Sequence, residues 1–374
     1  EPGLPDRRML DAAIGDRPGV AVRVCGHMAV ANTRALEETK PWLRYPDQVD
    51  REKGILVEDA VYYVVNKLLE KLDEKTLVEE AARALADAGI AGASSMACSD
   101  GEIRALLELD SRGDLPIRVA CYANRENYTR YLGRGVRRFK VVGLKLFADG
   151  SLGARTAAIS RDYADDPGNR GRLLLDYKMI AALGGDVLAR GGRVAVHAIG
   201  DRALAEVVEA YRILEPRLRG RIEHASIAPP SLVGEIAGLH VYTVVQPRFK
   251  LSDWWLEKRL GELAVYAYPF KTMRDAGVRL AFSTDAPVED YRPWLTFQAA
   301  MGDCGGRPCS GGESLEPREA IAYYTVEAAR ASGGPVGDLG RIEPGASAAL
   351  AYTGSSPLEK GWRGPLRKLD YSGV

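Results

Sequence analysis

Four ionisable side chains stand where short apolar runs of this sequence end. Lys145 follows Val-Val-Gly-Leu, His197 follows Val-Ala-Val, His224 follows Arg-Ile-Glu, and Asp285 follows Ala-Phe-Ser-Thr. Two imidazoles, a carboxylate and a lysine form a donor set suited to a zinc-like ion if the fold brings the four runs together. The chemistry to be tested is therefore metal-assisted catalysis.

Lys145 has two readings. An ammonium group flanked by apolar residues is costly to bury unless it is paired or used chemically. In the structural reading the side chain snorkels to water or pairs with a carboxylate such as Asp149. In the chemical reading burial favours the neutral amine. That amine can react with carbon dioxide to form a carbamate, an anionic two-oxygen ligand able to bridge two divalent metals.

His197 and His224 gain meaning as a pair. A single histidine at a strand end is more often a structural hydrogen-bonding residue, but two on successive strands, followed by Asp285, favour metal ligation. Two neighbouring carboxylates, Asp201 and Glu223, are interpreted as groups that orient the imidazoles. Their alternative is a role as solvated charges.

The elements that must position these residues alternate between short strands and longer helices. Seven strands are expected, at 89–98, 116–123, 139–150, 193–201, 219–227, 240–247 and 278–287. The alternation is typical of βαβ units and a parallel sheet, and the nearly continuous apolar runs indicate strands covered on both faces. In a closed (β/α)8 barrel, side chains at the carboxyl ends of the strands converge at one mouth. An eighth strand is expected before residue 1, leaving a seam between the strands at 90–98 and 278–284.

Several long strings resemble the amidohydrolase superfamily. They lie in the family's order at 145–157, 165–176, 194–204, 221–225, 284–289 and 324–345. They are most similar to the branch of uncharacterised metal-dependent hydrolases and N-substituted formamide deformylases, amidohydrolase family 3. The stretch at 16–36 resembles the insertion that this branch carries after its first barrel strand.

The resemblance implies an α/β fold, a (β/α)8 TIM-like barrel with its first strand missing from this chain. The barrel would span residues 1–342 and include the insertion at about 1–85. A remnant of a small β-sandwich would span 343–374. Ala349 stands where the family usually has an aspartate.

The resemblance also assigns metal ligands. Lys145 would be the carboxylated lysine that bridges two metals, and His197 and His224 would bind one of them. Asp285 would bind the other metal and transfer the proton. The family's His-x-His pair has no counterpart among the four histidines of this sequence. The cofactors implied are one or two divalent ions, zinc by preference, and a carbamate derived from carbon dioxide.

Other residues are candidates for substrate contacts. The resemblance places His27 in the insertion that covers the site, as a substrate contact or transition-state stabiliser; the alternative is a histidine that holds its loop. Arg248, Trp254 and Trp255 follow the strand at 240–247 and would line an apolar or aromatic pocket. A packed lid without selectivity is the alternative for these three.

The function expected is hydrolysis of a C–N bond in an amide, formamide or cyclic amide by metal-activated water, with Asp285 carrying the proton. Two rivals remain. One is a catalytically incomplete barrel that binds a small molecule or a partner chain. The other is a lyase or isomerase on the same scaffold, because a fold does not fix a reaction.

Composition narrows the partners. The 374 residues carry 51 Lys+Arg and 51 Asp+Glu, which argues against a general nucleic-acid binder. No apolar run of about 18 residues predicts a membrane span, and no signal peptide is evident.

Five scattered cysteines fit a reducing compartment, so a cytoplasmic location is expected. Glutamine and asparagine are rare, a drift typical of thermophile proteins. The expected partner is a small-molecule substrate, and a homodimer remains open.

Overall fold

The computed structural model describes residues 5–23, 26–69, 73–303, 312–359, 362 and 364–368. The chain divides into two units, Glu1–Glu74 and Lys75–Val374. None of the helices in the described ranges is long and apolar enough to cross a membrane.

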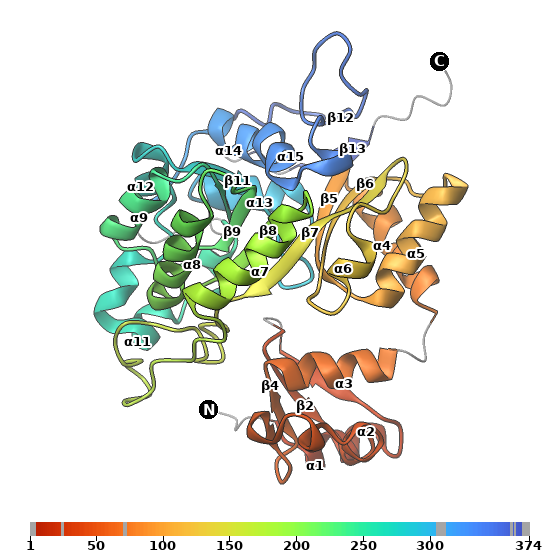
Figure 1. Cartoon of the computed structure of the whole chain (residues 1–374), viewed down its shortest axis with the longest axis vertical. Helices are drawn as coiled ribbons and strands as arrows, with labels where there is room; N and C mark the ends of the chain where they lie inside the picture. The colour runs from red at the N-terminus through yellow and green to blue at the C-terminus, as the bar shows by residue number, and fades with distance from the viewer. Residues whose placement is uncertain are drawn as a thin grey trace. The chain divides into compact units, whose positions relative to one another are not determined.

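A seven-stranded parallel sheet organises the larger unit (Figure 1). Its strands are β5 (Gly92–Cys98), β6 (Arg118–Ala123), β7 (Phe139–Phe147), β8 (Arg193–Ala198), β9 (Gly220–His224), β10 (Tyr242–Val245) and β11 (Arg279–Phe282). Each strand pairs with its neighbours in sequence, and the sheet curls into a half-barrel. Within the described residues, β5 and β11 are its edges, the two strands expected to flank the seam. The seven predicted strands are confirmed, and they are shorter than predicted because several polar ends lie in loops.

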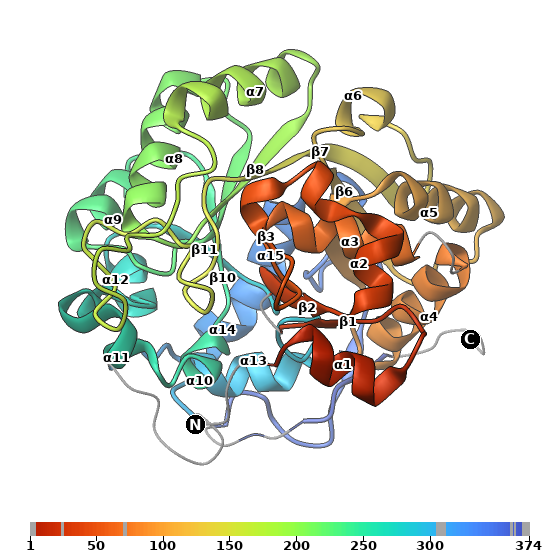
Figure 2. The same cartoon turned by 90° about the horizontal axis from the view of Figure 1, so that it is seen from below.

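Helices cover the outer side of this sheet (Figure 2). They are α4 (Glu74–Asp87), α5 (Asp100–Arg112), α6 (Tyr128–Tyr131), α7 (Tyr177–Ala189), α8 (Asp201–Leu214), α9 (Pro230–Ala237), α10 (Phe249–Ser252), α11 (Leu256–Leu260), α12 (Phe270–Asp275), α13 (Pro293–Ala300) and α14 (Pro317–Tyr324). Helix α15 (Val326–Ser332) packs instead on the inner face, where Ala329 is buried in one cluster with Val142 and Ala195. The boundaries of α5 show how sequence sets them. The Ser99 hydroxyl accepts a hydrogen bond from the Glu102 amide at its start, and Gly113 ends it with φ of 81°.

Alternation along β7 separates the outer core from the interior of the half-barrel. Leu144 and Leu146 are fully buried among the helices, in the same core as Val194 and Val196 of β8. Because successive side chains of a strand point to opposite faces, Lys145 turns to the inner face. The apolar residues on either side of this lysine thus anchor β7 to the helix layer.

The smaller unit is built on an antiparallel sheet. Its order is β1 (Val20–Val22), β2 (Met28–Ala31), β4 (Ile55–Val57) and β3 (Val49–Asp50). Helices α1 (Arg7–Ile14), α2 (Thr33–Thr39) and α3 (Asp59–Leu69) complete the unit. Leu36, Leu56 and Val64 are buried in its separate small core. The predicted extent of the insertion, to about residue 85, stays a prediction.

The end of the chain carries a short antiparallel pair, β12 (Ala351–Tyr352) with β13 (Arg367–Lys368). Whether this pair belongs to a β-sandwich stays a prediction. Four short 3-10 helices, at Pro41–Leu43, Pro46–Gln48, Gly261–Tyr266 and Gly334–Val336, complete the described elements.

Candidate metal and catalytic site

Register brings three of the predicted ligands to neighbouring strand ends. Lys145 on β7 pairs with Ala195 on β8, and His197 lies two residues further along β8. His197 in turn pairs with Glu223 on β9, so His224 is the next residue of that strand. Parallel strands thus place Lys145, His197 and His224 at one edge of the sheet, as predicted.

The two imidazoles contact each other. The ring centroids of His197 and His224 lie 4.5 Å apart at 70°, and the two residues are only 2% and 6% exposed. His224 has φ of 73°, and Asp285 in the loop after β11 has φ of 55°. Left-handed backbone is rare for residues with a side chain, and such strain concentrates at functional sites.

Hydrogen bonds give the two rings opposite tautomers. The Gly150 carbonyl, which can only accept, lies 2.9 Å from Nε2 of His197, so Nε2 carries a proton and the neutral form of the ring has its lone pair on Nδ1. The Gln246 amide nitrogen donates to the Val244 carbonyl and to Ser283. Its oxygen therefore accepts from Nδ1 of His224 at 2.8 Å, which leaves the lone pair of His224 on Nε2.

Burial keeps the His224 imidazole neutral, because desolvation lowers its pKa even though Asp285 opposes the effect. A neutral imidazole is the form that ligates a metal. Gln246, itself 3% exposed, was missed by the sequence analysis. Its only available signal was a rare glutamine at the end of an apolar run.

Lys145 is the third member of the cluster. The residue is 4% exposed, and its Nζ has no hydrogen-bond partner among the described residues. Nζ lies 4.5 Å from the centroid of the Phe147 ring. Desolvation lowers the pKa of Lys145 from 10.5 to about 8, against the opposing charges of Glu223 and Asp285. About a tenth of the amine is then neutral at pH 7, compared with about 0.03% at the ordinary pKa.

Glu223 forms a buried ion pair with Arg221, and its charge also acts on Lys145. Its two carboxylate oxygens meet Nε and Nη2 of Arg221 at 2.5 and 3.0 Å. Burial would raise the pKa of Glu223, but Arg221 and Lys145 outweigh it and lower that pKa. The Glu223 carboxylate thus binds Arg221, and its predicted role in orienting an imidazole stays a prediction.

Asp149, rather than Asp201, lies next to His197. The Asp149 carboxylate is fully buried, accepts hydrogen bonds from the amides of Ala158, Ile199 and Gly200, and lies 3.4 Å from Nε2 of His197. The Asp201 carboxylate instead accepts from the Ser160 amide at 2.8 Å. Asp149 therefore fixes the loop after β7 to the loop after β8, both of which contribute to the site.

The predicted substrate residues do not form one group. Arg248 binds Glu289 at 2.8 Å, and the Trp255 ring lies under Arg259, whose guanidinium carbon is 4.4 Å from the ring centroid. Trp254 is 83% exposed. Two other aromatic side chains reach the site, and the sequence analysis missed both: Phe249 is stacked on His224 at 6.1 Å between centroids, and Phe147 lies 5.4 Å from the His197 ring.

His27 lies in the smaller unit, where it is 6% exposed. Its Nδ1 lies 2.8 Å from Oε2 of Glu58. Glu58 has φ of 51°, and its Oε1 is buried without a hydrogen-bond partner within the described ranges. The His27–Glu58 pair can hold a proton or fix a tautomer, and the contact of His27 with substrate stays a prediction.

The donors fit a divalent metal in one specific way. In the part of the chain that the structure describes, no three His, Cys, Asp or Glu side chains gather as a metal site. Two imidazoles with lone pairs on different ring nitrogens, beside a buried amine without a hydrogen bond, still suit a metal once the amine becomes a carbamate. A lysine ammonium group has no lone pair and cannot bind a metal. Lys145 can therefore join the two histidines as a ligand only after it has become a carbamate.

The fold and the site together define an α/β protein with a curled, seven-stranded parallel sheet whose strand ends carry clustered imidazoles and a buried lysine. The chain belongs to the amidohydrolase family, whose family model matches residues 1–359. This confirms the resemblance inferred from the sequence strings.

Individual relatives agree with the family. The crystal structure of an uncharacterised metal-dependent hydrolase from Pyrococcus horikoshii OT3 is 34% identical; it matches with a TM-score of 0.81 over 95% of this chain and 74% of that one. YtcJ of Bacillus subtilis, named as an amidohydrolase, is 28% identical over 84% of this chain. The N-substituted formamide deformylase of Arthrobacter pascens is 28% identical over 48% of this chain. The chain spans 65% of the length of YtcJ and 34% of that of the deformylase.

Proposed function

We propose that this protein is a metal-dependent hydrolase of C–N bonds outside peptides, acting on an amide, formamide or cyclic amide. Family membership and the named activity of the deformylase relative support the bond type. The observation that carries the proposal is the buried Lys145 amine, which has no hydrogen-bond partner among the described residues, at the same strand ends as the two buried and contacting imidazoles of His197 and His224.

The metal would be held by Lys145 as its carbamate, together with His197 and His224. Imidazole ligands favour zinc among the common divalent ions. When bound, the metal supplies Lewis-acid polarisation of the carbonyl and a lowered pKa for water. Gly150 and Gln246 keep the imidazole lone pairs available, and Phe249 covers one face of His224.

Asp285 is proposed as the proton carrier. Its charge acts on both Lys145 and His224, and its backbone is held in the left-handed region. Its carboxylate would accept a proton from the attacking water while a C–O bond forms. It would return that proton to the nitrogen as the C–N bond breaks, so the products are an acid and an amine.

We also propose that the half-barrel corresponds to seven strands of a (β/α)8 barrel. An eighth strand would pair with the free edges of β5 and β11, since unpaired edges leave backbone groups without partners. That strand could bring further ligands to the same mouth.

The test is turnover of a panel of N-formyl amines, amides and cyclic amides by the zinc-loaded chain. Asp285→Asn should lower the rate about a thousandfold while zinc content is unchanged, because only proton transfer is removed. Asp290→Asn is the matched control, since Asp290 binds Arg292 in the same loop.

Two outcomes overturn the proposal. One is that Asp285→Asn turns over at the rate of the unchanged chain. The other is that no C–N bond in the panel is cleaved by a chain that holds zinc. Binding without turnover would favour the incomplete-barrel alternative, and elimination or isomerisation products would favour the lyase or isomerase.

A further inference from the structure

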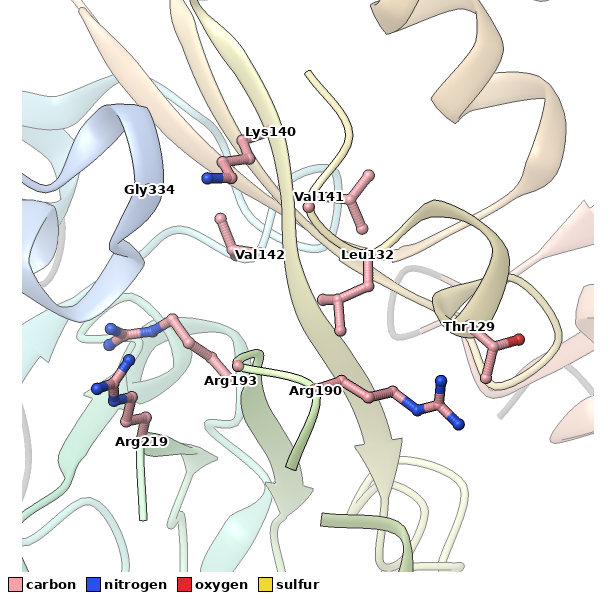
Figure 3. Close-up of a pocket in the computed structure, with 11 residues that line it drawn as sticks. Thr129, Leu132, Lys140, Val141, Val142, Arg190, Arg193, Arg219 and Gly334 are labelled. Atoms are coloured by element: carbon pink, nitrogen blue, oxygen red, sulfur yellow. The ribbon is translucent and has the colours of Figure 1, made fainter. Parts of the chain in front are cut away.

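A cavity opens at the amino ends of the strands, opposite the ends that carry the imidazoles. Its volume is about 530 Å³. Its walls come from α6 and the two residues after it, β7, the two residues after α7, β8, the residue before β9, and Gly334 (Figure 3). None of its lining residues belongs to the site described above.

The lining is strongly cationic. It contains Lys140, Arg190, Arg193 and Arg219, and no aspartate or glutamate of the described ranges lines it. Arg190 is neutralised by Asp186, whose carboxylate lies 2.8 Å from its Nε. The other three make no ion pair with a carboxylate among the described residues, so three positive charges share one concave surface.

Register forces two of these charges together. Val194 of β8 pairs with Gly220 of β9, so Arg193 and Arg219 occupy adjacent positions immediately before the pair. Figure 3 shows both guanidinium groups and the Lys140 amine turned to the same side. Like charges at adjacent strand positions are destabilising, and a bound anion would relieve that repulsion.

Arg193 is held in place in advance. Its Nε lies 3.3 Å from the hydroxyl of the fully buried Tyr122, and its Nη2 donates to the Ala331 carbonyl at 3.3 Å. The guanidinium packs over Gly333, where an added Cβ would lie 3.0 Å from the guanidinium carbon. A fixed guanidinium loses little side-chain entropy on binding a ligand, which is what a built recognition site requires.

The wall facing this arginine is closely packed. Gly334 lies against Val142, and an added Cβ would come within 2.5 Å of Cγ1 of that valine. Gly334 also has φ of 53°, so only glycine suits the position. The cavity shape therefore depends on a residue chosen for close approach of two segments far apart in sequence.

From this geometry we propose that the cavity binds a small phosphorylated molecule, with its phosphate between Arg193 and Arg219 and near Lys140. Guanidinium groups match phosphate oxygens in charge and geometry. The volume lies in the range of small-molecule sites and exceeds what one phosphate needs. The proposal does not depend on the reaction catalysed at the other end of the strands.

Calorimetric titration at constant ionic strength tests it, with pyrophosphate, inorganic phosphate, AMP and adenosine as the probes. Pyrophosphate and AMP should bind once per chain, and adenosine should not bind. Tighter binding of AMP than of phosphate identifies a phosphorylated organic ligand, whereas equal binding identifies phosphate itself.

Exposed residues supply the variants. Arg219→Gln and Lys140→Gln should each weaken pyrophosphate binding tenfold or more without loss of folding, because both side chains are exposed. Arg318→Gln, an exposed arginine on α14, is the matched control and should change nothing. The proposal is overturned if neither pyrophosphate nor AMP binds, or if the affinity for pyrophosphate is unchanged in both Arg219→Gln and Lys140→Gln.

Discussion

The Lys145 amine determines what the site can hold. With its pKa lowered to about 8 by burial, raising the pH from 7 to 8 takes the neutral fraction from about a tenth to about half. Each carbamate forms from one neutral amine and one carbon dioxide and releases one proton. At a fixed pressure of 13C-labelled carbon dioxide, the carbamate signal in NMR should therefore rise more than fivefold below saturation, because the higher pH also favours that proton release. Lys145→Arg should abolish it.

Lys250→Arg is the control for this experiment, since burial also lowers the pKa of Lys250 to about 8. The Lys250 amine donates to the Glu313 carbonyl and lies outside the imidazole cluster. A carbamate signal that persists in Lys145→Arg and vanishes in Lys250→Arg would show that Lys250, and not Lys145, is the modified residue.

The same shift makes a stability prediction for the metal-free protein kept free of carbon dioxide. The folded-state pKa of Lys145 lies below the unfolded value of 10.5, so the folded chain releases its proton first. Stability should rise as pH increases from 8 to 10.5. Lys145→Met should raise the free energy of unfolding at pH 7 by about 3 kcal/mol, and this gain should disappear above pH 10.5. Equal denaturant midpoints at pH 7 would contradict the buried charge.

Gln246 should act through His224. Gln246→Leu removes the acceptor from Nδ1, so the ring can take the other tautomer and lose its outward lone pair. Zinc affinity should fall about 10- to 100-fold, as measured by competition with a chelator. Gln298→Leu is the matched control, because that glutamine binds the Trp362 carbonyl away from the imidazoles. Equal zinc affinity in the two variants would show that Gln246 does not influence zinc binding by His224.

At the scale of elements, Asp149 joins two loops that no strand pairing connects. Its carboxylate receives three amide hydrogen bonds in a fully buried position. Asp149→Ala should cost about 4 kcal/mol of unfolding free energy, because three buried donors lose a charged acceptor. Asp162→Ala, in the exposed part of the same loop, should have a much smaller effect, because solvent screens its ion pair with Arg170. If Asp149→Ala and Asp162→Ala lower the free energy of unfolding equally in thermal denaturation, Asp149 does not have this role.

The sequence predicted the strands better than the contacts between their loops. Short apolar runs mark β5 to β11 because both faces are covered, and that pattern is local. The contact of Phe249 with His224, and that of Asp149 with the Gly200 amide, depends on how separate loops meet. Composition and periodicity carry no such information. Arg221 had a local signal, two residues before Glu223, but an arginine in a strand normally indicates solvent rather than a buried pair.

For the whole molecule, metal content is the decisive quantity. His197, His224 and a carbamate on Lys145 make one three-ligand site, so the 374-residue chain should hold one zinc per molecule, or none without carbon dioxide. His197→Ala and His224→Ala should each abolish retention after dialysis. His240→Ala should have no effect, because the His240 side chain is 81% exposed. Two tightly held ions would mean that ligands elsewhere in the chain were missed.

The order of strands in the sheet bears on how the chain acquires its fold during synthesis. Every strand from β6 to β11 pairs with the strand before it, so each βα unit can dock as it leaves the ribosome. The last segment behaves differently. Ser332 bonds Ser94 across 238 residues, and the Pro335 carbonyl bonds Arg118 across 217. Loop closure over such distances is slow. A nascent chain stalled before α15 should therefore contain the parallel sheet with β5 loosely held, and release of the final segment should lock it.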